Sequence, residues 1–220
     1  MSQDARSTPV QPGEIAPDFS LPAVHRDGMV ALREYRGRSP VLLAIFRGLF
    51  CPFCRRSIAQ LNATSETLRQ AGVEPIAVVA TELDNARLYF KLRPSKMAVV
   101  SDPDCTTHRA FGVPEPVMDA QMAQAVLATR VNPGGVLPGP LPIPEAGEAM
   151  AKLDGYQMNA TDERDRERHA AQLKGQFLID RSGVVRWANV ECASEGLAGL
   201  GKFPSQAELM NAVRTLARAG

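Results

Sequence analysis

The sequence lacks the features that mark nucleic-acid-binding and membrane proteins. Its 220 residues carry a net charge of only +1, with no basic stripe, so charge gives no reason to expect nucleic acid as a partner. No apolar run approaches the roughly 20 residues that a membrane helix needs, so we expect no membrane partner. The N-terminal stretch MSQDARSTPVQPG has no apolar core of a secretory signal, so we expect a cytoplasmic protein.

Cysteine and histidine are also scarce. Four cysteines do not form a disulfide framework in the cytoplasm, where thiols are kept reduced. His25, His108 and His169 form no H-x3–5-H pattern, and Cys105 and Cys192 form no second C-x-x-C, which disfavours a zinc site. The sequence therefore predicts no metal and no bound cofactor.

The chemistry is instead concentrated in one stretch, VLLAIFRGLFCPFCRRSIAQL, over residues 41–61. Its apolar start predicts a buried strand and its end a helix, so Cys51 and Cys54 lie at or just inside a helix N-terminus. Unpaired N–H groups and the helix dipole stabilise a thiolate there, which lowers a cysteine pKa from about 8.5 into roughly the 3.5–7.5 range. Arg47 and Arg55 are expected to support the thiolate. Cys51 and Cys54 are thus the candidate catalytic residues of thiol redox chemistry, with inert buried thiols as the alternative.

Strands and helices alternate along most of the chain, which predicts an α/β fold. Apolar runs at 41–46, 74–80 and 97–101 are separated by helical patterns, as in βαβ units with a parallel sheet. Short hairpins are expected around residues 18–32 and 176–190. A final helix follows the capping box formed by Ser205 and Glu208.

Two segments fall outside this pattern. Residues 1–12 are polar and predict a disordered arm, which leaves 13–220 as a single domain. An insertion spans residues 114–174. Within it, the proline- and glycine-rich 132–144 predicts irregular structure, and the alternating charges of 162–168 predict a solvated helical face. The insertion either covers the active site or forms a partner surface.

The order of these elements, with C-x-x-C at the end of the first core strand, resembles the thioredoxin superfamily. It is most similar to the alkyl hydroperoxide reductase/thiol-specific antioxidant (AhpC/TSA) group of peroxiredoxins and peroxiredoxin-like proteins. The resemblance is carried by Gly13–Phe19, Asp27–Gly28, Tyr35–Gly37, Val41–Cys54, Ser101–Pro103, Phe111–Val113 and Lys174–Asp180. It implies a thioredoxin-like fold, with a central mixed β-sheet flanked by helices, an N-terminal β-hairpin and a long insertion before the last hairpin.

The resemblance leaves open which cysteine attacks first. Peroxiredoxins carry P-x-x-x-T-x-x-C, and aligning its cysteine with Cys54 puts Arg47 at the proline position and Cys51 at the threonine position. In thioredoxins the first cysteine of the pair, here Cys51, attacks, and the second resolves. Cys192 is a weaker candidate for a resolving cysteine, and Lys202 for the peroxide-binding cation.

The resemblance implies an antioxidant oxidoreductase that reduces hydroperoxides through the Cys51/Cys54 dithiol, without a cofactor. An external thiol reductant, such as a thioredoxin or glutaredoxin, would reset the disulfide. Two alternatives stay open: a thioredoxin-like thiol–disulfide oxidoreductase that acts on protein disulfides, and a non-enzymatic redox sensor or scaffold. A homodimer is expected from the resemblance alone.

Overall fold

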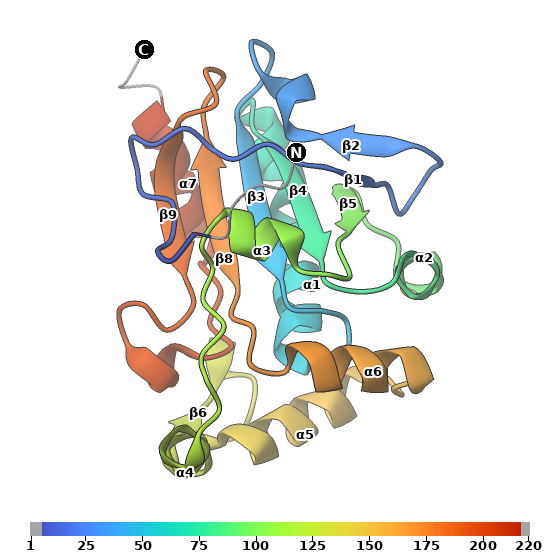
Figure 1. The fold of residues 1–220 in the computed structure, drawn as a ribbon, viewed down its shortest axis with the longest axis vertical. Coiled ribbons are helices and arrows are strands. Elements are labelled where there is room, and N and C mark those ends of the chain that lie inside the picture. Colours follow the sequence, from blue (N-terminus) through green and yellow to red (C-terminus); the bar gives the residue numbers. More distant parts are fainter. Residues whose placement is uncertain (1–5, 217–220) are drawn as a thin grey trace.

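A computed structural model describes residues 6–216, and its centre is a mixed five-stranded sheet in the order β5-β4-β3-β8-β9 (Figure 1). The strands are β3 (Val41–Phe46), β4 (Glu74–Val79), β5 (Ala98–Ser101), β8 (Gly175–Ile179) and β9 (Val185–Val190). The first three run parallel, and β8 and β9 add an antiparallel hairpin next to β3. Because β3 and β4 are covered on both faces, they are continuous apolar runs, which is why the sequence predicted them.

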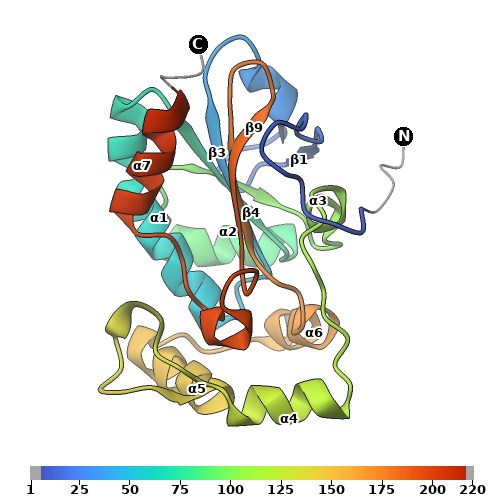
Figure 2. The same ribbon diagram turned by 90° about the vertical axis from the view of Figure 1, so that its left-hand side faces the viewer.

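Helices and a small hairpin cover the two faces of this sheet (Figure 2). One face carries α1 (Pro52–Gln70) and α7 (Gln206–Leu216). The other carries α3 (Thr106–Ala110) and the hairpin of β1 (Ser20–Pro22) and β2 (Met29–Ala31). The remaining elements of this part are the turn η1 (Leu32–Tyr35), α2 (Leu83–Leu92) between β4 and β5, and η3 (Gly196–Gly199). The expected α/β architecture is confirmed, including the N-terminal hairpin.

The N-terminal segment is more ordered than its composition suggests. Val10 is fully buried, and its N–H donates to the carbonyl of Phe111 at 3.0 Å. Gly112 has a φ of +66°, and a Cβ there would lie 2.0 Å from the carbonyl oxygen of Thr8. One apolar anchor and this close backbone approach hold the segment in place. The expected disordered arm therefore does not hold for residues 6–12, and residues 1–5 lie outside the described residues.

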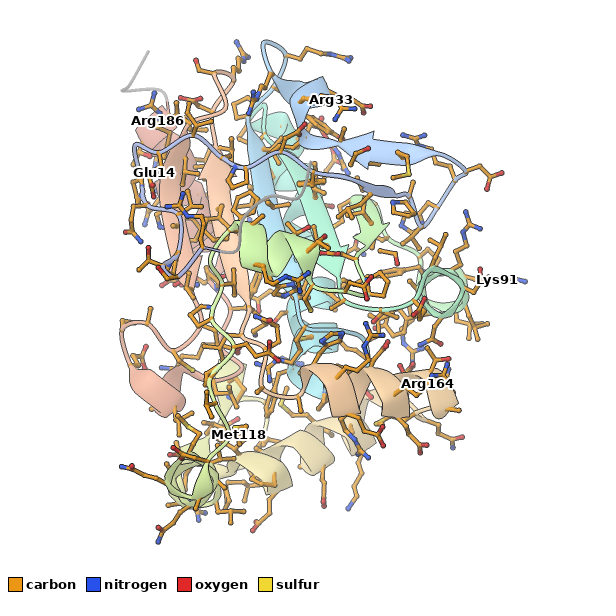
Figure 3. The ribbon with its side chains drawn as sticks, viewed as in Figure 1. Glu14, Arg33, Lys91, Met118, Arg164 and Arg186 are labelled. Carbon is orange, nitrogen blue, oxygen red and sulfur yellow. The ribbon has the colours of Figure 1, made fainter. Side chains whose placement is uncertain are left out.

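The insertion forms a separate layer below the sheet (Figures 1 and 2). It consists of α4 (Ala120–Ala128), β6 (Arg130–Val131), η2 (Pro133–Gly135), β7 (Leu141–Pro142), α5 (Ile143–Asp154) and α6 (Ala160–His169). Helix α5 packs against both α1 and α4. Figure 3 labels two side chains of this layer, Met118 ahead of α4 and Arg164 on α6. The layer thus lies across the N-terminal end of α1, next to the two cysteines.

Two expectations within the insertion are wrong. Residues 132–144 contain η2, β7 and the start of α5 rather than irregular structure alone. Helix α5 can begin in this proline-rich stretch because Pro144 falls in its first turn, where the missing N–H of proline costs nothing. The charged segment of α6 is not solvated throughout, since Asp162 and Asp165 are 0% and 1% exposed. Asp162 accepts a hydrogen bond from the Tyr156 hydroxyl at 2.6 Å, which replaces water. No helix among residues 6–216 has the length and hydropathy to cross a membrane.

Candidate active site

Cys51 caps the N-terminus of α1 directly after the turn that follows β3. Its backbone is extended, with φ −83° and ψ 116°, and Pro52 is the first helical residue. The N–H of Cys54 donates to the Cys51 sulfur at 3.4 Å. The turn needs a glycine at position 48, because φ is +140° there and a Cβ would lie 2.8 Å from the Ala80 carbonyl oxygen. The predicted position of both sulfurs at a helix N-terminus is confirmed.

The pKa values of the two thiols are shifted in opposite directions. Burial alone would raise the pKa of Cys51, but the hydrogen bond from Cys54 and the charges of Arg47 and Lys174 outweigh it and lower the pKa to about 6. Burial, the hydrogen bond to Cys51 and the charge of that sulfur raise the pKa of Cys54 well above its ordinary value. Cys51 is therefore the thiolate of the pair at neutral pH, and Cys54 the thiol.

Three buried charged side chains surround the pair. Arg47 forms an ion pair with Glu191, and the Lys174 Nζ lies 3.3 Å from Glu191 Oε1. Burial opposes ionisation of Glu191, but Arg47 and then Lys174 lower its pKa overall. The N–H of Gly201 also donates to Glu191 Oε1 at 2.7 Å. With Glu191 ionised, the three side chains sum to one positive charge, which the Cys51 thiolate balances.

Arg55 acts on the backbone next to the dithiol rather than on a sulfur. Its Nε pairs with Asp154 Oδ2 at 2.7 Å, and its Nη1 donates to the carbonyls of Leu49 and Phe50 at 2.8 and 3.0 Å. These bonds fix the turn immediately before Cys51. Arg55 was expected to support the thiolate, and its hydrogen bonds are with Asp154 and with the carbonyls of the turn.

Cys51 opens onto a mostly apolar pocket of about 590 Å³ that also includes Arg47. The insertion supplies most of the lining, with Met122, Val126, Ile143 and Met158 among its residues. Cys51 itself is only 4% exposed and Cys54 is completely buried. A small molecule that enters the pocket therefore meets Cys51, and the wall opposite it belongs to the insertion.

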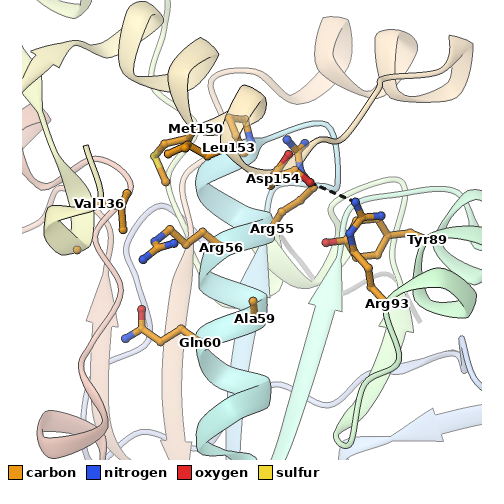
Figure 4. Close-up of a pocket in the computed structure, with 12 residues that line it drawn as sticks. Arg55, Arg56, Ala59, Gln60, Tyr89, Arg93, Val136, Met150, Leu153 and Asp154 are labelled. Atoms are coloured by element: carbon orange, nitrogen blue, oxygen red, sulfur yellow. Dashed lines mark hydrogen bonds and ion pairs between the residues drawn. The ribbon is translucent and has the colours of Figure 1, made fainter. Parts of the chain in front are cut away.

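A second hollow, of about 640 Å³, shares Pro52 and Arg55 with the first (Figure 4). Figure 4 shows Arg56, Arg93 and Asp154 around it. Arg93 also lies over the Tyr156 ring, at 5.6 Å from its centroid. No cysteine lines this hollow, so we place the chemistry in the pocket of Cys51.

The remaining sequence candidates lie outside the Cys51 pocket. Burial raises the pKa of Cys192 to about 11 and that of Cys105 to about 12. The Cys105 sulfur lies 3.5 Å from His169 Nδ1, a contact that the sequence did not indicate. Lys202 is half exposed and pairs with Glu195. Within residues 6–216 no group of three or more His, Cys, Asp or Glu side chains could hold a metal ion.

Lys174 and Glu191 belong to the charged cluster next to the cysteines, and neither was predicted as a site residue. Lys174 directly precedes β8 and Glu191 directly follows β9. Pairing of the two strands sets Gly175 opposite Val190, which brings the two side chains together. A charged residue on either side of the predicted hairpin was the signal in the sequence.

Solved structures with this fold include peroxiredoxins. The peroxidoxin BcpB from Mycobacterium tuberculosis is 13% identical over 95% of this chain and 97% of its own, with a TM-score of 0.57. A reduced 2-Cys peroxiredoxin from Plasmodium vivax is 17% identical over 96% and 83%, with a TM-score of 0.59. Thioredoxin peroxidase I from Plasmodium yoelii is 17% identical over 95% and 90%, with a TM-score of 0.54. At these identities the likeness shows the thioredoxin-like fold alone.

No curated protein matches the sequence significantly. The sequence matches the AhpC/TSA family over residues 12–188. The matched region includes both cysteines, Arg47 and Lys174. A match of this extent implies a thiol peroxidase, hence an oxidoreductase with a peroxide substrate and a thiol reductant, and it shows that this peroxiredoxin-like chain belongs to the AhpC/TSA family.

Proposed function

We propose that the protein reduces hydroperoxides with Cys51 as the attacking residue and Cys54 as the resolving residue. The observation that carries the proposal is the difference between the two sulfurs. Cys51 caps the helix, has a pKa lowered to about 6 and lines the pocket, whereas Cys54 is fully buried with a raised pKa. The attacking species is the thiolate, so the sulfur that is both ionised and reachable attacks first.

The proposed reaction has three stages: oxidation of Cys51, formation of the disulfide and its reduction. The Cys51 thiolate attacks the terminal oxygen of R–O–OH, the O–O bond breaks, and Cys51–SOH forms while RO⁻ takes up a proton and leaves as ROH. Cys54 then attacks the Cys51 sulfur, and the hydroxyl leaves as water with the Cys54 proton. An external thiol reduces the disulfide by two exchange steps, with a thioredoxin or glutaredoxin as the expected donor.

Arg47 is the group that we propose to bind the peroxide. It lines the Cys51 pocket, and its Nε–H is buried without a hydrogen-bond partner among residues 6–216. An unpartnered buried donor is costly, so a ligand oxygen that accepts from it is favoured. The apolar walls of the pocket suit the carbon skeleton of an organic hydroperoxide.

The second candidate is a thiol–disulfide oxidoreductase. It is favoured by the position of Cys51, which is the one that attacks in thioredoxins, and by the absence of the peroxiredoxin proline and threonine at positions 47 and 51. In that reaction the Cys51 thiolate would attack a disulfide sulfur of a partner, and Cys54 would release the reduced partner.

Rapid oxidation of the fully reduced protein separates these candidates. We expect cumene hydroperoxide to oxidise Cys51 much faster than it oxidises a free thiol, with a Cys51–Cys54 disulfide as the product in mass spectrometry. A protein disulfide as oxidant should react slowly. Fast reaction with the protein disulfide and none with either cumene hydroperoxide or hydrogen peroxide would establish the second candidate instead. Oxidation without turnover in the presence of a thiol donor would indicate a sensor.

A further inference from the structure

We infer that Lys174 is a positioning residue that gives the site one surplus positive charge, which stabilises first the thiolate of Cys51 and then that of Cys54. The inference rests on the proposed dithiol function. It assigns to Lys174 a role in the resolving step, in which Cys54 attacks the oxidised Cys51.

The Lys174 ammonium is fully buried and has three oxygen acceptors around it. Its side chain is 0% exposed, and Nζ donates to Ser57 Oγ at 3.1 Å and to the Lys202 carbonyl at 3.2 Å. Glu191 Oε1, at 3.3 Å, is the third acceptor. An ammonium has three protons and no lone pair, so three acceptors match the charged form. These acceptors therefore surround the ammonium in a place where an unpaired charge would be very costly.

The position of Ser57 places this cation against the dithiol. Ser57 lies three residues after Cys54 on α1, and side chains at that spacing are neighbours on one face of a helix. The Lys174 ammonium that binds Ser57 is thus next to the turn that carries Cys54. Its charge lowers the pKa of both Cys51 and Cys54, although burial dominates for the second.

The charged groups around the sulfurs come from several elements. Arg47 follows β3, Lys174 precedes β8 and Glu191 follows β9. His108 on α3 adds no charge, because burial lowers its pKa to about 3. Arg47, Lys174 and Glu191 therefore sum to +1, and the neighbouring Arg55 adds no net charge because Asp154 pairs with it.

The surplus positive charge can balance only one thiolate at a time. While Cys51 is ionised the site is neutral, and a second thiolate at Cys54 would leave a buried net negative charge. Once the peroxide has converted Cys51 to a neutral sulfenic acid, the positive charge is uncompensated again and favours ionisation of Cys54. The loss of charge at the first sulfur thus prepares the second to attack. Without Lys174 the two remaining charges, on Arg47 and Glu191, would cancel after oxidation, and Cys54 would stay protonated.

The first test isolates Cys54 and requires no peroxide. In a Cys51→Ser, Cys105→Ser, Cys192→Ser background, the ultraviolet absorbance of the thiolate reports the titration of Cys54 alone. We expect Lys174→Met to raise the Cys54 pKa by about one unit or more, which is about a tenfold loss of thiolate. Lys91→Met, at an exposed position on α2, is the matched control and should leave it unchanged. An unchanged titration in folded Lys174→Met would overturn the inference, even if the protein reduces no peroxide.

The second test distinguishes charge from packing. Glu191→Gln raises the surplus to two positive charges, so the same titration should shift in the opposite direction, to lower pH. Shifts in one direction for both variants would show a structural role and refute the inference. If Lys174→Met does not fold, Ser57→Ala, which removes one acceptor of the ammonium, takes its place with a smaller upward shift, and no shift there would likewise refute it. With peroxide and the native cysteines, the Cys51 sulfenic acid should persist about tenfold longer in Lys174→Met.

Discussion

The backbone N–H of Cys54 donates to the sulfur of Cys51 at 3.4 Å while both cysteines are reduced. The bond is possible because Cys51 is the N-cap residue and Cys54 is the third residue of the helix, the position whose N–H a capping side chain usually binds. A sulfur that accepts such a bond is stabilised as an anion. Two residues of the same type therefore acquire different chemistry from their positions in one helical turn.

Replacement of each cysteine should distinguish the attacking residue from the resolving residue. Cys51→Ser should abolish oxidation by cumene hydroperoxide, because Cys54 is completely buried and does not line the pocket. Cys54→Ser should still be oxidised once, but it should stop at a Cys51 sulfenic acid that dimedone traps and mass spectrometry detects. Cys105→Ser and Cys192→Ser are the controls and should keep most of the turnover. A sulfenic acid on Cys54 in Cys51→Ser would reverse the assignment.

The reactivity of Cys51 should depend on pH with a midpoint near 6. The folded state lowers its pKa from 9.0 to about 6, so the thiolate is lost as pH falls through that value and iodoacetamide labelling should slow about tenfold per pH unit below it. The same shift stabilises the folded state fully above pH 9 and loses that contribution as pH falls to about 6. Labelling of Cys51 with a midpoint above pH 8 would contradict this prediction.

Arg47 and Arg55 should differ in what their loss changes. Arg47→Met removes a charge that lowers the Cys51 pKa, so the labelling midpoint should move up by about one unit or more. Arg55→Met removes bonds to the carbonyls of Leu49 and Phe50, so it should lower the melting temperature and leave the midpoint nearly unchanged. Measuring both quantities on both variants makes each the control of the other. A larger midpoint shift in Arg55→Met would restore the role that the sequence suggested for it.

The sequence predicted the parts of the fold that depend on neighbouring residues. The strand Val41–Phe46 follows from a local apolar run and agrees with the predicted 41–46, and α1 begins at Pro52 with the cysteines at its N-terminus, as expected. The two sulfurs could be placed for the same reason. Arg47, close to Cys51 in the chain, lines the same pocket as that sulfur, and its effect on the thiolate stays a prediction.

The rest of the site depends on strand pairing that no local pattern records. Lys174 and Glu191 meet because Gly175 pairs with Val190, and nothing near Cys51 signals either residue. Arg55 was assigned to the thiolate by proximity in sequence, whereas Asp154 in the insertion decides where its side chain lies. Tertiary packing determines which residues form long-range ion pairs of this kind.

Asp162 is another residue whose place depends on tertiary packing, because its carboxylate is buried and hydrogen-bonded inside the protein. Its carboxylate accepts hydrogen bonds from the Tyr156 hydroxyl at 2.6 Å, the Asn85 amide at 3.0 Å and the Asn159 N–H at 3.1 Å. These bonds connect the start of α6 to α2 and to the segment after α5. Asp162→Asn keeps the size but removes the charge, so we expect a loss of about 1.5–3 kcal/mol in the free energy of unfolding, measured with denaturant.

The same substitution should weaken substrate binding without changing the thiol. Arg166 and Ala170, on and just after α6, line the Cys51 pocket, whereas the dithiol and its charged partners lie on other elements. A loosened α6 should therefore raise KM for cumene hydroperoxide and leave the labelling midpoint of Cys51 unchanged. Glu163→Gln, an exposed neighbour in the same helical turn, is the matched control and should change neither stability nor KM appreciably. An unchanged KM in a clearly destabilised Asp162→Asn protein would mean that α6 is not part of the substrate-binding wall.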